Sequence, residues 1–129
     1  MTVTAYSAVQ PASVSLANNT QTLVLQLRLP NTGYFVVFGR VVVSNLAPGV
    51  QPIQATMTTL DGTTTLDFAS VDLPGLSGGN GAVMVLNAIL NLNASNQNEI
   101  VDIRCSGTNG AAQYCSLIAI PVDAISGSV

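Results

Sequence analysis

In the stretch Leu23-Val24-Leu25-Gln26-Leu27-Arg28-Leu29, four leucines occupy alternate positions, and Gln26 and Arg28 lie between them. Successive side chains of a β-strand point to opposite faces, so this spacing places the leucines on one face and the polar pair on the other. The stretch predicts a strand with one buried face and one solvated face. The residues that follow, Pro30-Asn31-Thr32-Gly33, predict a turn.

The same period of two extends along the chain on both sides of this stretch. It predicts further strands over residues 34–45, 53–60, 63–68, 82–92, 99–106 and 114–122, and one or two weaker strands within 2–16. Asp61-Gly62, flanked by threonine-rich strands, predicts a hairpin with a type I′ turn. Residues 46–52, 73–81, 93–98 and 106–113 are predicted to form loops or turns because glycine, proline, asparagine and serine are frequent there.

Residues 34–45 are apolar on both faces, with Arg40 as the only charged side chain. This pattern predicts a central strand that is covered on both sides. Gly39 within it indicates a bulge or a close approach of another part of the chain.

About eight strands, short connections and no credible helix predict an all-β protein. Half-buried strands need a second sheet to cover their apolar side, which favours an antiparallel β-sandwich. The jelly roll is the preferred topology. At 129 residues, the chain is expected to form a single domain over 1–129.

The small number of charged residues, and the types that are missing, exclude many functions. The chain has three Arg or Lys residues (all of them arginine), six acidic residues and no histidine. Serine or cysteine nucleophiles activated by an imidazole are therefore absent, and so are lysine Schiff bases. Two cysteines are too few for an ordinary zinc site, and a net charge of −3 opposes nucleic-acid binding. We expect no enzyme activity, no catalytic residues, no metal and no cofactor.

The six acidic residues are dispersed along the sequence: Asp61, Asp67, Asp72, Glu99, Asp102 and Asp123. A pair of carboxylates can hydrolyse a glycosidic bond, so a carboxylate-based hydrolase stays as the least favoured alternative. Solvated surface positions are the favoured role for these residues.

Cys105 and Cys115 flank a nine-residue connection between two predicted strands, and a disulfide between them is one candidate feature. Cys105 shares its face with Val101 and Ile103, whereas Cys115 is opposite in phase to Ile118 and Ile120. Both cysteines can face inward only if a bulge intervenes. The other interpretation is two small buried thiols.

Tyr6, Tyr34 and Tyr114 are the candidate ligand contacts, because aromatic rings can stack on sugars. With the many asparagine and threonine residues, they make a lectin-like carbohydrate-binding domain the alternative function. Core packing is the competing role, above all for Tyr34.

Hydrophobic residues make up 48% of the chain, yet it has no run of about 18 apolar residues, so no membrane insertion is expected. The N-terminal residues lack the features of a signal peptide, although the uncharged polar composition is typical of secreted or surface proteins. Few charges and an apolar excess favour a homo-oligomer. The strand face of residues 34–43 and the face with Val83, Val85 and Ile89 are the candidate interfaces.

Gly33-Tyr34-Phe35-Val36-Val37-Phe38, followed by Val41-Val42-Val43, resembles the glycine–aromatic central strand of C1q/TNF-like jelly rolls. Ser116-Leu117-Ile118-Ala119-Ile120 resembles their buried last strand, and small uncharacterised bacterial β-sandwich proteins have a similar layout. The resemblance implies a binding or structural module rather than a reaction, with a protein or glycan as partner. It transfers no site residue to this chain.

Overall fold

The computed structural model describes residues 4–17, 20–29, 33–59, 64–75, 81–92 and 99–123. These ranges contain nine β-strands and no helix, hence no helix that could cross a membrane. The strands are β1 (Tyr6–Gln10), β2 (Val14–Ala17), β3 (Thr22–Leu29), β4 (Gly33–Asn45), β5 (Gln51–Thr59), β6 (Thr64–Leu73), β7 (Gly81–Leu92), β8 (Glu99–Ser106) and β9 (Asn109–Val122).

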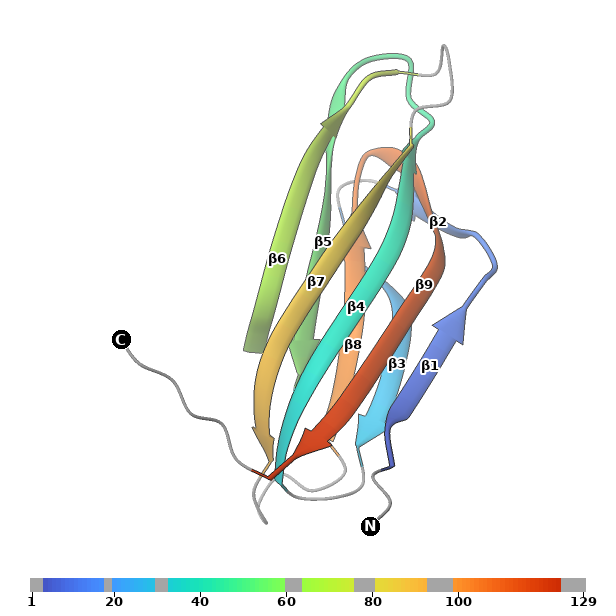
Figure 1. Cartoon of the computed structure of the whole chain (residues 1–129). Helices are drawn as coiled ribbons and strands as arrows, with labels where there is room; N and C mark the ends of the chain where they lie inside the picture. The colour runs from blue at the N-terminus through green and yellow to red at the C-terminus, as the bar shows by residue number, and fades with distance from the viewer. Residues whose placement is uncertain are drawn as a thin grey trace.

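The strands form two sheets that lie one behind the other (Figure 1). Sheet A has the order β1-β9-β4-β7, and β2 also pairs with β9 beyond the end of β1. Sheet B has the order β3-β8-β5-β6. The strand pairs are all antiparallel. The prediction of an antiparallel β-sandwich is therefore confirmed.

The core lies between the sheets and is built from alternate residues of each strand. In β7, Met84, Leu86, Leu90 and Leu92 are buried, and the residues between them are exposed or half-buried, as the sequence pattern predicts. The largest fully buried side chain is Phe35 of β4, which the ring of Tyr6 meets edge to face at a centroid distance of 6.2 Å. Burial of these side chains supplies the main stabilisation of the fold.

The leucine stretch of β3 departs from strict alternation at its first residue. Leu25, Leu27 and Leu29 point toward the core, but Leu23 is exposed and Val24 is buried in its place. The register with β8 shifts between Leu23 and Leu25. This bulge adds one residue to β3 and reverses the side-chain phase before it, so the predicted inward position of Leu23 is wrong.

Gly39 lies where β4 passes over the core. A Cβ atom there would be 2.8 Å from Cδ1 of Ile103 and 2.9 Å from Cε of Met57, both on the opposite sheet. The close approach predicted for Gly39 is therefore present. β4 itself is central in sheet A, between β9 and β7, but the sandwich covers only one of its sides.

The last strand begins earlier than predicted. Residues 109–113 belong to β9 rather than to a turn, because they pair with both β2 and the end of β4. Gly110, Ala111 and Ala112 are small enough to be buried there. Their pairing with two strands outweighs their weak intrinsic preference for strands. The predicted hairpin at Asp61-Gly62 lies outside the described residues, although β5 and β6 on either side of it do pair antiparallel.

Two buried amides join the loops at one end of the sandwich. The side-chain nitrogen of Asn45 donates to the carbonyl oxygens of Gly49, Leu73 and Pro74 at 2.9–3.0 Å. Its oxygen accepts hydrogen bonds from the Ala47 N–H and from Gln51 Nε2. Gln51 in turn binds the backbone of Thr108 and Asn109. This network satisfies polar groups that would be costly to bury alone.

Candidate interaction face

The outer side of sheet A is a mostly apolar surface, which we call face A. Its residues follow from strand phase and exposure: Ser7 and Val9 of β1; Ser15 of β2; Tyr34, Val36, Phe38, Arg40, Val42 and Ser44 of β4; Val83, Val85, Asn87, Ile89 and Asn91 of β7; and Gln113, Tyr114, Ser116, Ile118 and Ile120 of β9.

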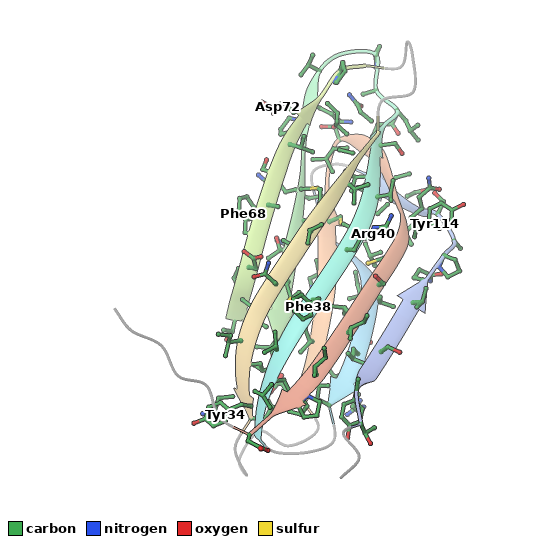
Figure 2. All side chains as sticks on the ribbon, in the orientation of Figure 1. Tyr34, Phe38, Arg40, Phe68, Asp72 and Tyr114 are labelled. Carbon is green, nitrogen blue, oxygen red and sulfur yellow. The ribbon has the colours of Figure 1, made fainter. Side chains whose placement is uncertain are left out.

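The strand registers arrange these side chains in rows across the sheet. Val36 lies between Ile120 of β9 and Ile89 of β7, which makes one continuous apolar row. The next row pairs Phe38 with Ile118. Val85 and Ile89 are 61% and 60% exposed, and Phe38 is 46% exposed. Figure 2 shows Phe38 near the middle of this face. A concentration of large apolar side chains on one outer face is uncommon in a monomer.

The outer side of sheet B, face B, has a different composition. Its residues are Leu23, Gln26 and Arg28 of β3; Pro52, Gln54, Thr56 and Thr58 of β5; Thr65, Phe68, Ser70 and Asp72 of β6; and Ile100, Asp102, Arg104 and Ser106 of β8. Polar and charged side chains dominate it. One outer side of the sandwich is therefore mostly apolar, and the other is mostly polar.

Face B also shows how this chain accommodates a charge on an outer surface. Asp102 is fully buried although it points away from the core. Arg104 covers it with an ion pair of 3.1 Å between Nη2 and Oδ2, and the Thr58 hydroxyl donates to Oδ1. Because these side chains enclose the carboxylate, Asp102 is closed to any substrate in this structure.

The three tyrosines do not come together. Tyr6 is half-buried against Phe35, while Tyr34 and Tyr114 are exposed toward opposite ends of sheet A (Figure 2). A sugar-binding platform needs aromatic rings that converge on one ligand. The three tyrosines therefore do not form one shared platform, and a sugar contact by the exposed Tyr34 or Tyr114 alone stays a prediction.

Tyr114 has a different conspicuous feature, a φ of +49°. It lies where the register between β4 and β9 shifts, between the pairs Val42–Gln113 and Arg40–Ser116. This bulge on β9 reverses the side-chain phase of the residues before it. Cys115 follows the bulge and points inward in regular alternation with Leu117 and Ala119, whereas Ile118 points outward. The prediction that Cys115 faces inward only if a bulge intervenes is therefore wrong, because it took the side of Ile118 and Ile120 as the core side of this strand.

Cys105 and Cys115 are both fully buried, and both are free thiols in the structure. They enter the core from opposite sheets, Cys105 on β8 and Cys115 on β9. Burial raises the pKa of each thiol from 9.0 to about 12, and the nearby Cys115 adds to the rise for Cys105. The second interpretation of the sequence, two buried thiols, describes this structure.

Within the described ranges, no group of three or more histidine, cysteine or acidic residues is arranged to hold a metal ion. Of the acids there, Asp67 accepts hydrogen bonds from the backbone of Phe68 and Asn87, and Glu99 is buried. Asp72 and Asp123 are exposed.

Sequence reasoning did not find the Asn45–Gln51 network, because its partners are backbone atoms of three separate loops.

Comparisons with known proteins concern the fold. No protein-family model matches the chain, and no curated protein matches it. Among solved structures, the chain is similar to the Eiger TNF from S. frugiperda, with 12% identity, a TM-score of 0.62 and 98% of both chains covered.

A second similar structure is that of the Gx strain of infectious bursal disease virus. The identity is 14% and the TM-score is 0.52, over 92% of this chain and 32% of the viral chain. Identities this low show the fold alone. The resemblance to jelly-roll domains is confirmed, and the chain is an all-β, antiparallel jelly-roll sandwich.

Proposed function

We propose that this protein is a non-enzymatic structural module that works as a component of an assembly, with face A as its contact surface. One observation carries the proposal: face A is apolar and exposed, whereas face B of the same sandwich is polar. An outer sheet face that stays in water normally carries alternate polar residues. Face A instead has the composition of a surface that another molecule covers.

Burial of the apolar side chains of face A would contribute substantially to the free energy of association. Full burial of a valine, isoleucine or phenylalanine side chain stabilises by about 1.5–3 kcal/mol, and the exposed side chains of face A would gain roughly half of that each. Phe38, Val83, Val85, Ile89, Ile118 and Ile120 lie within this one surface. Their sum offsets much of the entropic cost of association, which is on the order of 4–15 kcal/mol.

Sedimentation velocity at micromolar concentration tests the proposal. The unmodified protein is expected to associate, and Ile89→Glu on face A is expected to weaken the association by about tenfold or more, because a buried carboxylate without a partner is costly. Leu23→Glu is the matched control, since Leu23 is an exposed apolar residue of face B whose neighbour on β8 is Arg104. A monomeric unmodified protein, or equal effects of both substitutions, would contradict the proposal.

A further inference from the structure

Arg40 is the one charged side chain among the described residues of face A. Its neighbours across the strands are Ser116 on β9 and Val85 on β7, and Phe38 and Val42 flank it along β4. No described carboxylate lies within ion-pair distance of its guanidinium, whereas Arg104 on face B has Asp102. A molecule that covers face A must therefore bring an acceptor to Arg40, because an unpaired buried charge strongly opposes association.

The chain itself offers few acids for this role. Asp67 and Asp102 already accept hydrogen bonds, and Glu99 is buried. Asp72 on β6 and Asp123 at the end of β9 are the exposed acids among the described residues. Of the described acids, these two can approach Arg40 of another copy without losing a hydrogen bond or leaving a buried position.

Asp72 comes with a second matching feature. We call Phe68, Ser70 and Asp72 the β6 rim, since they share the outward side of the edge strand β6. Phe68 is 52% exposed, a large apolar side chain on a mostly polar face. Figure 2 shows Phe68 and Asp72 along the same edge of the sandwich. The rim thus combines an apolar group and an acid.

The spacing on the two surfaces agrees. Phe68 and Asp72 are four residues apart on one strand face, about 13 Å at 3.3 Å per residue. On β4, Val36 is also four residues from Arg40, and it lies in the apolar row between Ile120 and Ile89. If Asp72 of the second copy lies on Arg40, and β6 of that copy runs in the same direction as β4, Phe68 lies on that row. Asp123 has no such apolar companion at this spacing, because it lies one residue beyond the last strand.

We propose that a second copy of this chain covers face A with its β6 rim, so that Asp72 pairs with Arg40 and Phe68 packs on the row through Val36. The inference rests on the proposed assembly role. It joins two different surfaces of the chain, so the contact is head-to-tail. Such a contact produces a closed ring or an open filament, depending on the rotation between copies.

Charge exchange tests the pairing. Arg40→Asp and Asp72→Arg are each expected to weaken self-association by about tenfold or more, since each leaves like charges opposed. The double variant Arg40→Asp/Asp72→Arg restores the pair with its charges reversed, and its association is expected to return to within about threefold of the unmodified protein. Both positions are exposed, and circular dichroism with thermal unfolding checks that each variant keeps the fold.

Asp123→Arg provides the matched control, alone and with Arg40→Asp. The proposal expects no rescue from it. Rescue by Asp123→Arg, or a double Arg40/Asp72 variant no better than either single variant, overturns the pairing while leaving assembly through face A intact. If the unmodified protein is a monomer, the result contradicts both the pairing and the proposed function. Sedimentation velocity reads out all of these variants at equal concentration.

Discussion

The carboxylate of Asp67 joins the edge strands of the two sheets: its Oδ2 accepts the backbone N–H of Asn87 at 2.9 Å. Asp67 lies on β6, the edge of sheet B, and Asn87 lies on β7, the edge of sheet A. Its other oxygen accepts the N–H of Phe68. An edge strand with free N–H groups can pair with other chains, and an acid at the edge prevents this locally.

Asp67→Ala is expected to lower the free energy of unfolding by about 0.5–1.5 kcal/mol, because the Asn87 N–H loses its acceptor. Asp67→Asn keeps an oxygen at this position and is expected to retain most of the stability. Urea unfolding of the three proteins measures the difference. Equal losses in Ala and Asn variants would show that the charge, and not the hydrogen bond, matters.

Gly39→Ala is expected to destabilise the protein by about 1–3 kcal/mol, the usual cost of overpacking a core. The added methyl group would lie 2.8 Å from Ile103 and 2.9 Å from Met57, and Leu117 closes the third side at 3.4 Å. Gly49→Ala is the control, since a Cβ atom there meets no heavy atom within 4 Å. Chemical unfolding that gives both variants the same stability would contradict the close approach.

Periodicity was sufficient to predict the sandwich, because apolar and polar residues alternate along a strand that has one buried and one solvated face. It could not place the register shifts, of which the described strand pairs contain three, in β3–β8, β4–β9 and β5–β6. At Leu23 and at Tyr114, one extra residue reverses the phase, and nothing local in the sequence marks either position. Pairing with the neighbouring strand decides where the extra residue lies. For this reason the predicted inward position of Leu23 is wrong. The bulge predicted as the condition for an inward Cys115 is wrong for another reason: both sides of β9 are apolar, and the core side carries Leu117 and Ala119 rather than Ile118 and Ile120.

The candidate site was predictable in part. The apolar phase of residues 34–43 and of Val83, Val85 and Ile89 marked two candidate faces. The structure shows that both belong to face A, since β4 and β7 are neighbours in one sheet. The isolation of Arg40 could not be predicted, because it depends on which acids the fold brings near. The dispersal of the three tyrosines likewise follows from the three-dimensional arrangement rather than from composition.

Tyr114→Gly is expected to leave stability unchanged or to raise it by up to about 1 kcal/mol. A positive φ strains a residue with a side chain, and glycine adopts it freely. The exposed ring contributes little packing to set against this gain. Tyr114→Val is the contrasting variant and should lower the melting temperature, because a β-branched residue disfavours a φ of +49° most strongly. If thermal unfolding ranks valine above glycine, the bulge is not strained as described.

The two buried thiols make stability depend on pH in the alkaline range. In the folded protein, burial raises each thiol pKa to about 12, whereas the unfolded chain keeps a value near 9.0. Between these values the unfolded state releases protons that the folded state retains, so the free energy of unfolding falls as pH rises through this window. Well below pH 9 the thiols are protonated in both states, and this contribution to the pH dependence vanishes.

We therefore expect a steeper alkaline loss of stability in the native protein than in a Cys105→Ala/Cys115→Ala variant, whose remaining slope comes from other groups. Urea unfolding between pH 8 and 11 measures it. The same thiols should resist alkylation in the folded protein at pH 8, since a buried thiol with a raised pKa forms almost no thiolate. Both should react once urea unfolds the chain, and intact mass should then show two added groups. Parallel pH profiles for the two proteins would contradict the raised pKa values, and a mass without alkyl groups after unfolding, absent any reductant, would mean that Cys105 and Cys115 are bridged.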